Sequence, residues 1–210
     1  MSALLDFILR LPVQQGWLGD LISYFRGGGL VMYPLLLISA FMWTLIFERV
    51  IAFHRLEFRD MGMDELLRWY REERRQPEKN GLRQQIGSYL QARRTADTQL
   101  NRRLLDECYL KLAPGIDRHI SVIGALAMVS PLLGLLGTVT GMMTTFDVIS
   151  LFGTGNSRAL AGGISEALIT TQSGLLVSIP GVFAGAVLAL RARRLHERLE
   201  ESIMTLKRIA

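Results

Sequence analysis

Glu166 is the only charged side chain between residues 159 and 190, in a stretch that is otherwise apolar or uncharged. A charge at the centre of a membrane-spanning helix costs roughly 2.5–3.5 kcal/mol unless it faces a polar cavity or a partner, and such residues commonly mark ion or proton paths. If this stretch crosses a membrane, Glu166 predicts a functional site, because structure alone rarely needs a carboxylate there.

Hydroxyl side chains accompany Glu166 on the same predicted helix. At 3.6 residues per turn, Thr170 and Ser173 share its face, whereas Thr171 and Gly174 lie on the adjacent face. Hydroxyl and carboxylate oxygens can hold a file of water molecules or bind a cation. The three hydroxyls are therefore candidates for a polar path, and Gly174 is a candidate for close helix packing.

A second apolar stretch, residues 120–146, carries a matching stripe. Gly134, Thr138, Gly141 and Thr145 recur at i, i+4, i+7 and i+11, so they share one helical face. Gly137 and Gly141 also form a GxxxG pair, and small residues let helix backbones approach closely in lipid. Tight packing explains the glycines, whereas the threonines add polar groups that packing does not require.

An outer turn at about residues 150–160 makes these two helices antiparallel, so depth can be counted inward from the turn. Counting places Thr138 level with Thr171, and Thr145 level with Glu166. A full proton relay needs more acceptors than this chain supplies. We therefore expect an assembly, in which a partner helix brings its own carboxylate or several copies of this chain surround a common axis.

The distribution of charge predicts the elements that position these residues. Half of the 210 residues are hydrophobic, yet the 24 basic and 19 acidic residues are nearly absent from residues 27–47, 120–146 and 159–190. Roughly 20 helical residues cross a hydrocarbon core of about 30 Å. The sequence predicts an all-α integral membrane protein with three transmembrane helices, long cytoplasmic helical extensions and a helical cytoplasmic loop.

Basic residues predict the orientation. Residues 52–121 contain fourteen Lys or Arg and the tail from residue 191 contains six, against Arg10 and Arg26 before the first span and Arg158 between the second and third. The positive-inside rule then places the N-terminus outside and the C-terminus in the cytoplasm. The charges expected at the membrane boundary are Glu48, Arg49, Arg191 and Arg193.

These patterns divide the chain into seven expected segments. They are an outer interfacial helical region (1–29), transmembrane helix 1 (30–51), a cytoplasmic helical loop (52–119), transmembrane helix 2 (120–149), a short periplasmic turn (150–160), transmembrane helix 3 (161–190) and a cytoplasmic tail (191–210). In the first segment, one apolar helical face is formed by Trp17, Leu18, Leu21, Ile22 and Phe25, and three glycines follow it.

The cytoplasmic loop has the periodicity of helices. Residues 64–76 predict one amphipathic helix, residues 77–81 a turn, and the stretch from Leu82 onward a longer helix. Its expected buried residues are Ile86, Leu90, Leu100, Leu104 and Leu112. We expect this loop to pack against the cytoplasmic extensions of the second and third helices and against neighbouring subunits.

The residues that could serve an enzyme are scattered. His54, His119 and His196 lie near or beyond the inner membrane surface, and Cys108 has no evident partner. No metal-ligand spacing or phosphate-binding glycine motif is present in the sequence. We therefore expect no catalytic residues, no metal and no cofactor, and the unclustered basic residues do not predict nucleic-acid binding.

The two polar stripes lie in motifs that resemble the MotA/TolQ/ExbB proton-channel family. The motifs are PLLGLLGTVTG from Pro131 to Gly141 and GISEALITTQSG from Gly163 to Gly174, the latter followed by Pro180. The three-span layout, with Met32-Tyr-Pro34 and Phe47-Glu-Arg49 at the two ends of the first span, resembles the ExbB branch.

This resemblance implies a homopentamer in the bacterial inner membrane whose second and third helices line a pore around an ExbD-like dimer of single-span helices. By motif position, Thr138, Glu166 and Thr171 would line the proton pathway, and an aspartate on the partner would carry the proton. Proton flow would energise TonB-dependent outer-membrane transport through a TonB-like protein.

Two alternatives stay open. A TolQ-like subunit would serve envelope integrity, whereas a flagellar stator fits less well because that branch has a fourth span. A non-conducting membrane scaffold would use Glu166 only to anchor a partner. The sequence leaves undecided the cargo, the choice between H⁺ and Na⁺, the stoichiometry, and the role of Thr170.

Overall fold

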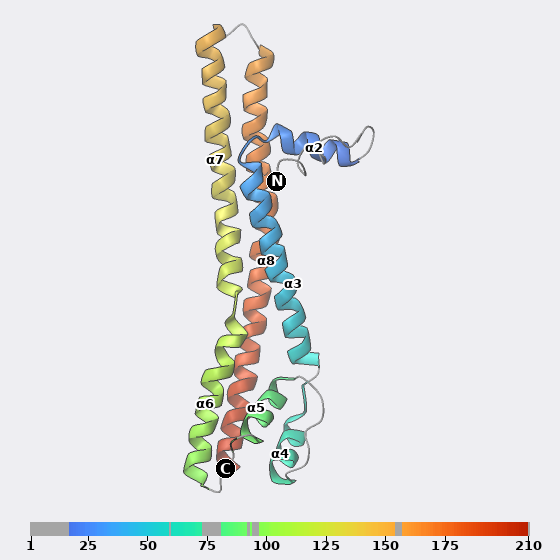
Figure 1. The fold of residues 1–210 in the computed structure, drawn as a ribbon, viewed down its shortest axis with the longest axis vertical. Helices are drawn as coiled ribbons and strands as arrows, with labels where there is room; N and C mark the ends of the chain where they lie inside the picture. Colours follow the sequence, from blue (N-terminus) through green and yellow to red (C-terminus); the bar gives the residue numbers. More distant parts are fainter. Residues whose placement is uncertain are drawn as a thin grey trace. The chain divides into compact units, whose positions relative to one another are not determined.

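The computed structural model describes residues 17–58, 60–72, 81–91, 93, 97–153 and 157–209. The described residues form helices joined by turns, and no strand occurs among them, which confirms the all-α prediction (Figure 1). The helices are α2 (Trp17–Gly27), α3 (Met32–Phe58), α4 (Met63–Glu72), α5 (Leu82–Gln91), α6 (Thr98–Asp117), α7 (Ile120–Phe152) and α8 (Ser157–Ile209).

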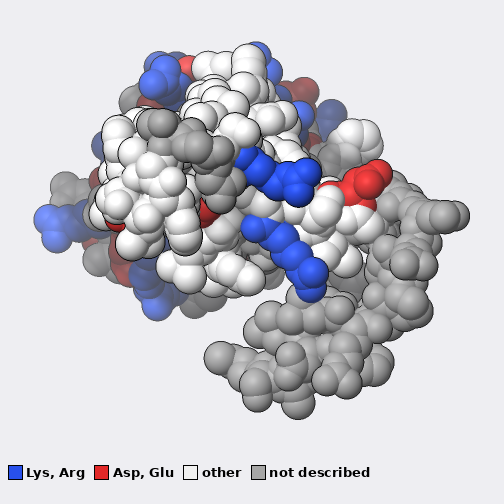
Figure 2. All heavy atoms as spheres, turned by 90° about the horizontal axis from the view of Figure 1, so that it is seen from above, with Lys and Arg blue, Asp and Glu red and all other residues white. Residues whose placement is uncertain are grey.

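Three helical segments of the described chain are long and apolar enough to cross a membrane: Met32–Phe58, Thr98–Phe152 and Leu160–Ile209. Much of their apolar surface is exposed, as expected for side chains that contact lipid. Figure 2 looks along the long axis, and most of the described surface that faces the viewer there belongs to uncharged residues. The chain is therefore a membrane protein, as the three windows with almost no charged residue predicted.

Contacts divide the chain into two compact units. The first comprises Met1–Ala40 and Ala127–Ile179, and the second comprises Phe41–Leu126 and Pro180–Ala210. In the first unit, α7 and α8 lie side by side and antiparallel (Figure 1), and α2 leads into α3 through a three-glycine turn. Pro34 stands in the first turn of α3, where a missing backbone donor is tolerated.

The core of the second unit is built from apolar residues of the end of α3, the loop helices and the end of α8. Its fully buried members include Phe53, Leu66, Leu82, Ile86, Leu105, Leu195, Leu199 and Leu206. The leucines of α8 recur at i, i+4 and i+11, so one stripe of that helix faces the loop helices. Burial of this stripe holds short helices that would be marginal alone.

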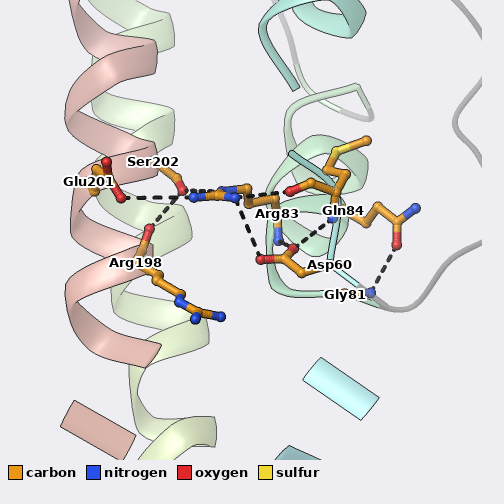
Figure 3. A network of polar contacts seen from close by, with 8 residues as sticks. Asp60, Gly81, Arg83, Gln84, Arg198, Glu201 and Ser202 are labelled. Atoms are coloured by element: carbon orange, nitrogen blue, oxygen red, sulfur yellow. Dashed lines mark hydrogen bonds and ion pairs between the residues drawn. The ribbon is translucent and has the colours of Figure 1, made fainter. Parts of the chain in front are cut away.

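Arg83 connects the loop helices to α8 (Figure 3). Its Nε donates to Ser202 Oγ at 3.1 Å, and Nη2 lies 3.8 Å from a carboxylate oxygen of Glu201. Its backbone N–H donates to Asp60 Oδ1 at 2.9 Å, and Nη1 donates to the Met61 carbonyl at 3.0 Å. Arg83, which lies in α5, therefore contacts both the segment before α4 and α8.

Three further polar contacts join α6 to α8. The Tyr109 hydroxyl donates to Glu200 at 3.0 Å, His196 Nε2 lies 2.9 Å from Asp117 Oδ2, and Lys207 pairs with Asp106. The expectation that the loop packs against the extension of the third helix is thus confirmed.

The long helix expected from Leu82 onward is wrong, because α5 ends at Gln91 and α6 begins at Thr98. The side chain of Asp97 caps the new helix by accepting from the Gln99 N–H at 2.8 Å. A fresh start changes the helical phase. Leu100 is therefore 47% exposed, and the buried positions of α6 include Leu105, Cys108 and Ile116.

Ile86 and Leu90 are buried as predicted, whereas Leu104 and Leu112 are only partly buried. Several predictions lie outside the described residues: the first sixteen residues with Arg10, most of the turn at 77–81, the end of the helix at 64–76, and residues 154–156 of the turn between α7 and α8.

Candidate polar track along helices α7 and α8

Glycines bring the backbones of α7 and α8 into direct contact. A methyl group added at Gly141 would lie 2.8 Å from the Gly163 carbonyl oxygen, and one added at Gly174 would lie 2.8 Å from the Ser130 carbonyl oxygen. A methyl group added at Gly134 would lie 3.1 Å from the Thr170 carbonyl oxygen of α8. These glycines therefore allow an approach that any side chain would prevent.

Two of the candidate hydroxyls are buried in this interface. Thr170 is 1% exposed, and its side chain lies 2.4 Å from where a methyl group at Gly137 would be. Thr145 is 5% exposed, and its Oγ1 lies 2.2 Å from the corresponding point at Gly163. Both side chains fill the space that glycine leaves on the opposite helix, so their first role is packing.

Thr138 and Thr171 are more accessible than these. Each is partly exposed, and each hydroxyl donates to a carbonyl of its own helix, Thr138 to Leu135 at 2.6 Å and Thr171 to Ala167 at 3.1 Å. A hydroxyl that donates in this way keeps lone pairs free to accept. The two oxygens can therefore accept a hydrogen bond from water or from a protonated group, or they can coordinate a cation.

Glu166 extends toward the turn between α2 and α3. A methyl group added at Gly29 would lie 1.8 Å from Glu166 Oε1 and 2.7 Å from its carboxyl carbon. Gly29 has φ +65°, a left-handed conformation that glycine adopts without strain. The carboxylate, which is partly exposed, therefore occupies the position that a side chain at residue 29 would take.

Ser173 lies on the same side of α8 and is 4% exposed. Its hydroxyl contacts the Ile169 carbonyl at 2.8 Å and the Tyr24 hydroxyl at 3.2 Å. Tyr24 was not among the candidate residues of the sequence analysis. The one sign in the sequence was a hydroxyl-bearing side chain within the amphipathic helix. The side of α8 that carries Glu166 and Ser173 is thus covered by α2 and the turn after it.

Thr145 and Glu166 lie within one helical turn of each other in depth, but the two side chains do not face each other. Thr145 faces Gly163, and Glu166 faces Gly29, because α8 turns positions 163, 167, 170 and 174 toward α7. Position 166 belongs to the neighbouring face of α8. Thr171 lies opposite Gly134, one helical turn from Thr138, so these two threonines occupy similar depths.

Ser178 adds a hydrogen bond between the helices that the sequence did not single out. Its hydroxyl donates to the Ala127 carbonyl of α7 at 2.8 Å, and the side chain is buried. Apart from such links, hydroxyls of this unit donate one turn back along their own helix, as Thr140 does to Gly137 and Thr144 does to Thr140.

The boundary charges of the first span have specific partners. Arg49 is 5% exposed and donates through Nη1 to the Gly115 carbonyl at 3.0 Å, near the end of α6. Glu48 lies 3.7 Å from Arg49 and 3.0 Å from His119 Nδ1. His119 has φ +65° between α6 and α7, so the pair on α3 braces a strained junction.

Arg191 and Arg193 differ in their surroundings. Arg191 is partly buried and lines an apolar groove of about 300 Å³ together with Val50, Phe183 and Val187. Arg193 is exposed. Elsewhere in the described chain, no group of three or more His, Cys, Asp or Glu side chains is arranged to hold a metal ion.

The described track therefore combines five hydroxyls with one titratable carboxylate in apolar helices. Oxygens of this kind can hold water or a cation, and Glu166 can accept a proton at one position. A proton that crosses the membrane along these helices needs further acceptors, and other molecules must supply them.

Comparison with known proteins gives this site a context. The pattern of the MotA/TolQ/ExbB proton channel family matches residues 73–201. The biopolymer transport protein ExbB-like 1 of Synechocystis sp. is 32% identical over 174 residues, covering 76% of this chain and 66% of that protein.

Two further relatives match this chain over a shorter stretch. Biopolymer transport protein exbB1 of Vibrio cholerae is 39% identical over 87 residues, which is 41% of this chain and 37% of that protein. Tol-Pal system protein TolQ of Haemophilus influenzae is 37% identical over 82 residues, which is 39% of this chain and 36% of that protein. The chain thus spans just under two thirds of the Synechocystis relative and little more than a third of the other two.

Proposed function

The chain belongs to the MotA/TolQ/ExbB proton channel family, in its ExbB-like branch, and from this premise we propose that it is a subunit of a motor driven by the proton-motive force. It catalyses no chemical reaction in this proposal. Proton passage along α7 and α8 is coupled to mechanical work on partner proteins, which deliver energy to TonB-dependent transport across the outer membrane.

One observation carries this proposal most directly: a carboxylate and several hydroxyls lie along two apolar helices packed through glycine. A scaffold would be more stable without Glu166, because the charge is costly in a membrane helix unless it has a polar environment. Thr138 and Thr171 keep accessible acceptor oxygens at similar depth, which suits a hydrated path.

The proposed complex contains five copies of this chain around an ExbD-like dimer of single-span helices. A single chain provides one carboxylate on the track, and the partner aspartate supplies the missing proton acceptor. The distribution of Lys and Arg supports a bacterial inner-membrane orientation with the N-terminus in the periplasm and the C-terminus in the cytoplasm. A TonB-like protein completes the path from proton flow to outer-membrane receptors.

The proposal is tested by reconstituting the purified complex in vesicles and following proton entry with a pH-sensitive dye. We expect flux with the single-span partner, little flux without it, and a large loss in Glu166→Gln and in Thr138→Val. A complex that assembles normally and conducts equally in both variants would contradict the proposed pathway. A complex that never conducts would favour the scaffold alternative.

The relative named TolQ favours one second candidate, a subunit that maintains envelope integrity. A deletion strain separates the two roles. Poor growth on scarce iron with normal detergent resistance supports outer-membrane uptake, whereas detergent sensitivity with normal iron-limited growth supports envelope maintenance.

A further inference from the structure

The three-glycine turn between α2 and α3 lies directly on α8. Methyl groups added at Gly27 or Gly28 would lie 3.0 Å from side-chain carbons of Ile169, and one added at Gly29 would lie 1.8 Å from Glu166 Oε1. Ile169 and Glu166 are one helical turn apart on the same side of α8. The turn therefore forms a lid over the position of the carboxylate.

Gly29 has two separate reasons to be glycine. Its φ of +65° favours glycine, and the space beside its Cα is filled by the Glu166 carboxylate. Either reason alone would disfavour a side chain. Only the second connects residue 29 to the proposed proton path.

Tyr24 holds the end of α2 at this place. Its backbone carbonyl accepts from the Gly28 N–H at 3.2 Å, and its side-chain hydroxyl forms the hydrogen bond with Ser173 at 3.2 Å. The first contact closes the end of α2, and the second fixes it on α8. A displacement of α2 would therefore move the turn that faces Glu166.

We propose that Gly29 and Tyr24 are positioning residues for Glu166, which make helix α2 a control element for proton passage. Gly29 leaves room for the carboxylate, and Tyr24 keeps the turn over it. The inference rests on the proposed function, because positioning matters only if Glu166 takes part in proton passage.

The central test is Gly29→Ala in the complex with its single-span partner, measured as dye-reported proton flux in vesicles. The added methyl group must displace Oε1 by about 1.5 Å to restore ordinary van der Waals separation. We expect flux to fall roughly ten- to hundredfold, because misplacement of a reacting group by about 1 Å has effects of that size.

Gly153→Ala is the matched control for backbone strain. Gly153 has φ +66°, close to that of Gly29, but a methyl group there would meet no atom of the described residues within 4 Å. This variant carries the same conformational penalty without contacting the carboxylate. We expect its flux to equal that of the unmodified complex.

Glu166→Asp provides a rescue that a general structural defect would not show. Aspartate is shorter by one methylene group, which shortens the side chain by about 1.5 Å and relieves the collision with the added methyl group. The Gly29→Ala, Glu166→Asp double variant should therefore conduct better than Gly29→Ala alone, although Glu166→Asp by itself lowers flux.

Tyr24→Phe tests the proposal without adding bulk, in case Gly29→Ala fails to assemble. It removes one neutral hydrogen bond and should lower flux roughly two- to fivefold. Tyr33→Phe on α3 is its control, because Tyr33 is 65% exposed and should tolerate the change.

The outcomes separate this inference from the proposed function. Normal flux in Glu166→Gln would overturn the proposed role of the carboxylate itself. If Glu166→Gln abolishes flux while Gly29→Ala matches Gly153→Ala, or while Glu166→Asp gives no rescue, the positioning role is wrong and the proposed function stands. If Gly29→Ala does not assemble, equal flux in Tyr24→Phe and Tyr33→Phe overturns it.

Discussion

The backbones of Gly141 in α7 and Gly163 in α8 are in contact with each other. A methyl group added at either residue would lie 2.8 Å from the carbonyl oxygen of the other. Backbone atoms cannot move aside as a flexible side chain can, so this pair, like Gly174 and Ser130 further along, limits how closely the two helices approach. The candidate polar track depends on that approach, because it holds Thr145 and Thr170 inside the interface.

Gly141→Ala should therefore destabilise the complex. Separating two packed backbones to admit a methyl group costs typically about 1–3 kcal/mol, and the better helix propensity of alanine offsets up to about 1 kcal/mol of that. Thermal unfolding of the detergent-solubilised complex measures the difference. Gly162→Ala is the control, because a methyl group there meets no atom of the described residues within 4 Å. This variant should be neutral or slightly stabilising. Equal melting of both variants would show that the contact is not tight.

Arg49→Gln should loosen the junction between α6 and α7. The guanidinium is nearly buried and donates to the Gly115 carbonyl at 3.0 Å, and hydrogen bonds that involve a charged group contribute about 1.5–3 kcal/mol. Arg55→Gln is the matched change at an exposed position of the same helix. We expect a lower unfolding temperature for Arg49→Gln alone. A similar small effect in both variants would mean that Arg49 acts only as a surface charge.

The apolar helices could be predicted because their signal is local. Windows with almost no charged residue at 27–47, 120–146 and 159–190 are visible in the sequence. Helices α7 and α8 include the second and third windows, and α3 covers the first from Met32 onward. The glycine stripe was also visible, since its spacing follows the helical period. Gly163 was not assigned to packing, because the residues four positions away, Ala159 and Ala167, are alanines and do not make a pair of glycines.

The partners of individual side chains could not be predicted, because they depend on which face each helix turns to its neighbour. Glu166 and Thr170 share a face by simple counting, yet one contacts Gly29 and the other Gly137. A rotation of α8 by a fraction of a turn decides between these arrangements. The break before α6 was missed for another reason: Asp97 caps the helix where neither Gly nor Pro marks an end.

Arg83→Gln should free the segment around α5 from α8. The substitution removes contacts with Ser202, Glu201 and the Met61 carbonyl, while the backbone bond to Asp60 remains. Amide hydrogen exchange across residues 60–72 and 81–91 should accelerate roughly tenfold, as expected when local opening becomes easier by about 1.4 kcal/mol.

Arg93→Gln is the control for this experiment. Arg93 pairs with Glu107 at 3.1 Å, but both side chains are about half exposed, at 49% and 48%. Exposed ion pairs contribute little, about 0–1 kcal/mol. Amide hydrogen exchange should therefore change only slightly in Arg93→Gln. Acceleration equal to that of Arg83→Gln would argue against a special role for the contacts of Arg83.

Cys108 should react slowly with thiol reagents while the protein is folded. Burial, followed by the charge of the neighbouring Glu107, raises the pKa of the thiol from 9.0 to about 11, so the reactive thiolate is about 100-fold scarcer near neutral pH. Maleimide labelling at pH 7.5 should therefore be at least about 100-fold slower in the folded protein than in denaturant. Ser88→Cys in a Cys108→Ala background provides an exposed thiol as control and should react quickly in both states.

The raised pKa of Cys108 also determines how the stability of the folded protein changes with pH. The folded state favours the neutral thiol, so its contribution is fully present below pH 9 and is lost as the pH rises toward 11, where the unfolded chain ionises first. Unfolding temperatures measured from pH 8 to pH 11 should fall more steeply for the unmodified chain than for Cys108→Ala. Parallel curves, together with rapid labelling of the folded protein, would show that the thiol is not held neutral by its surroundings.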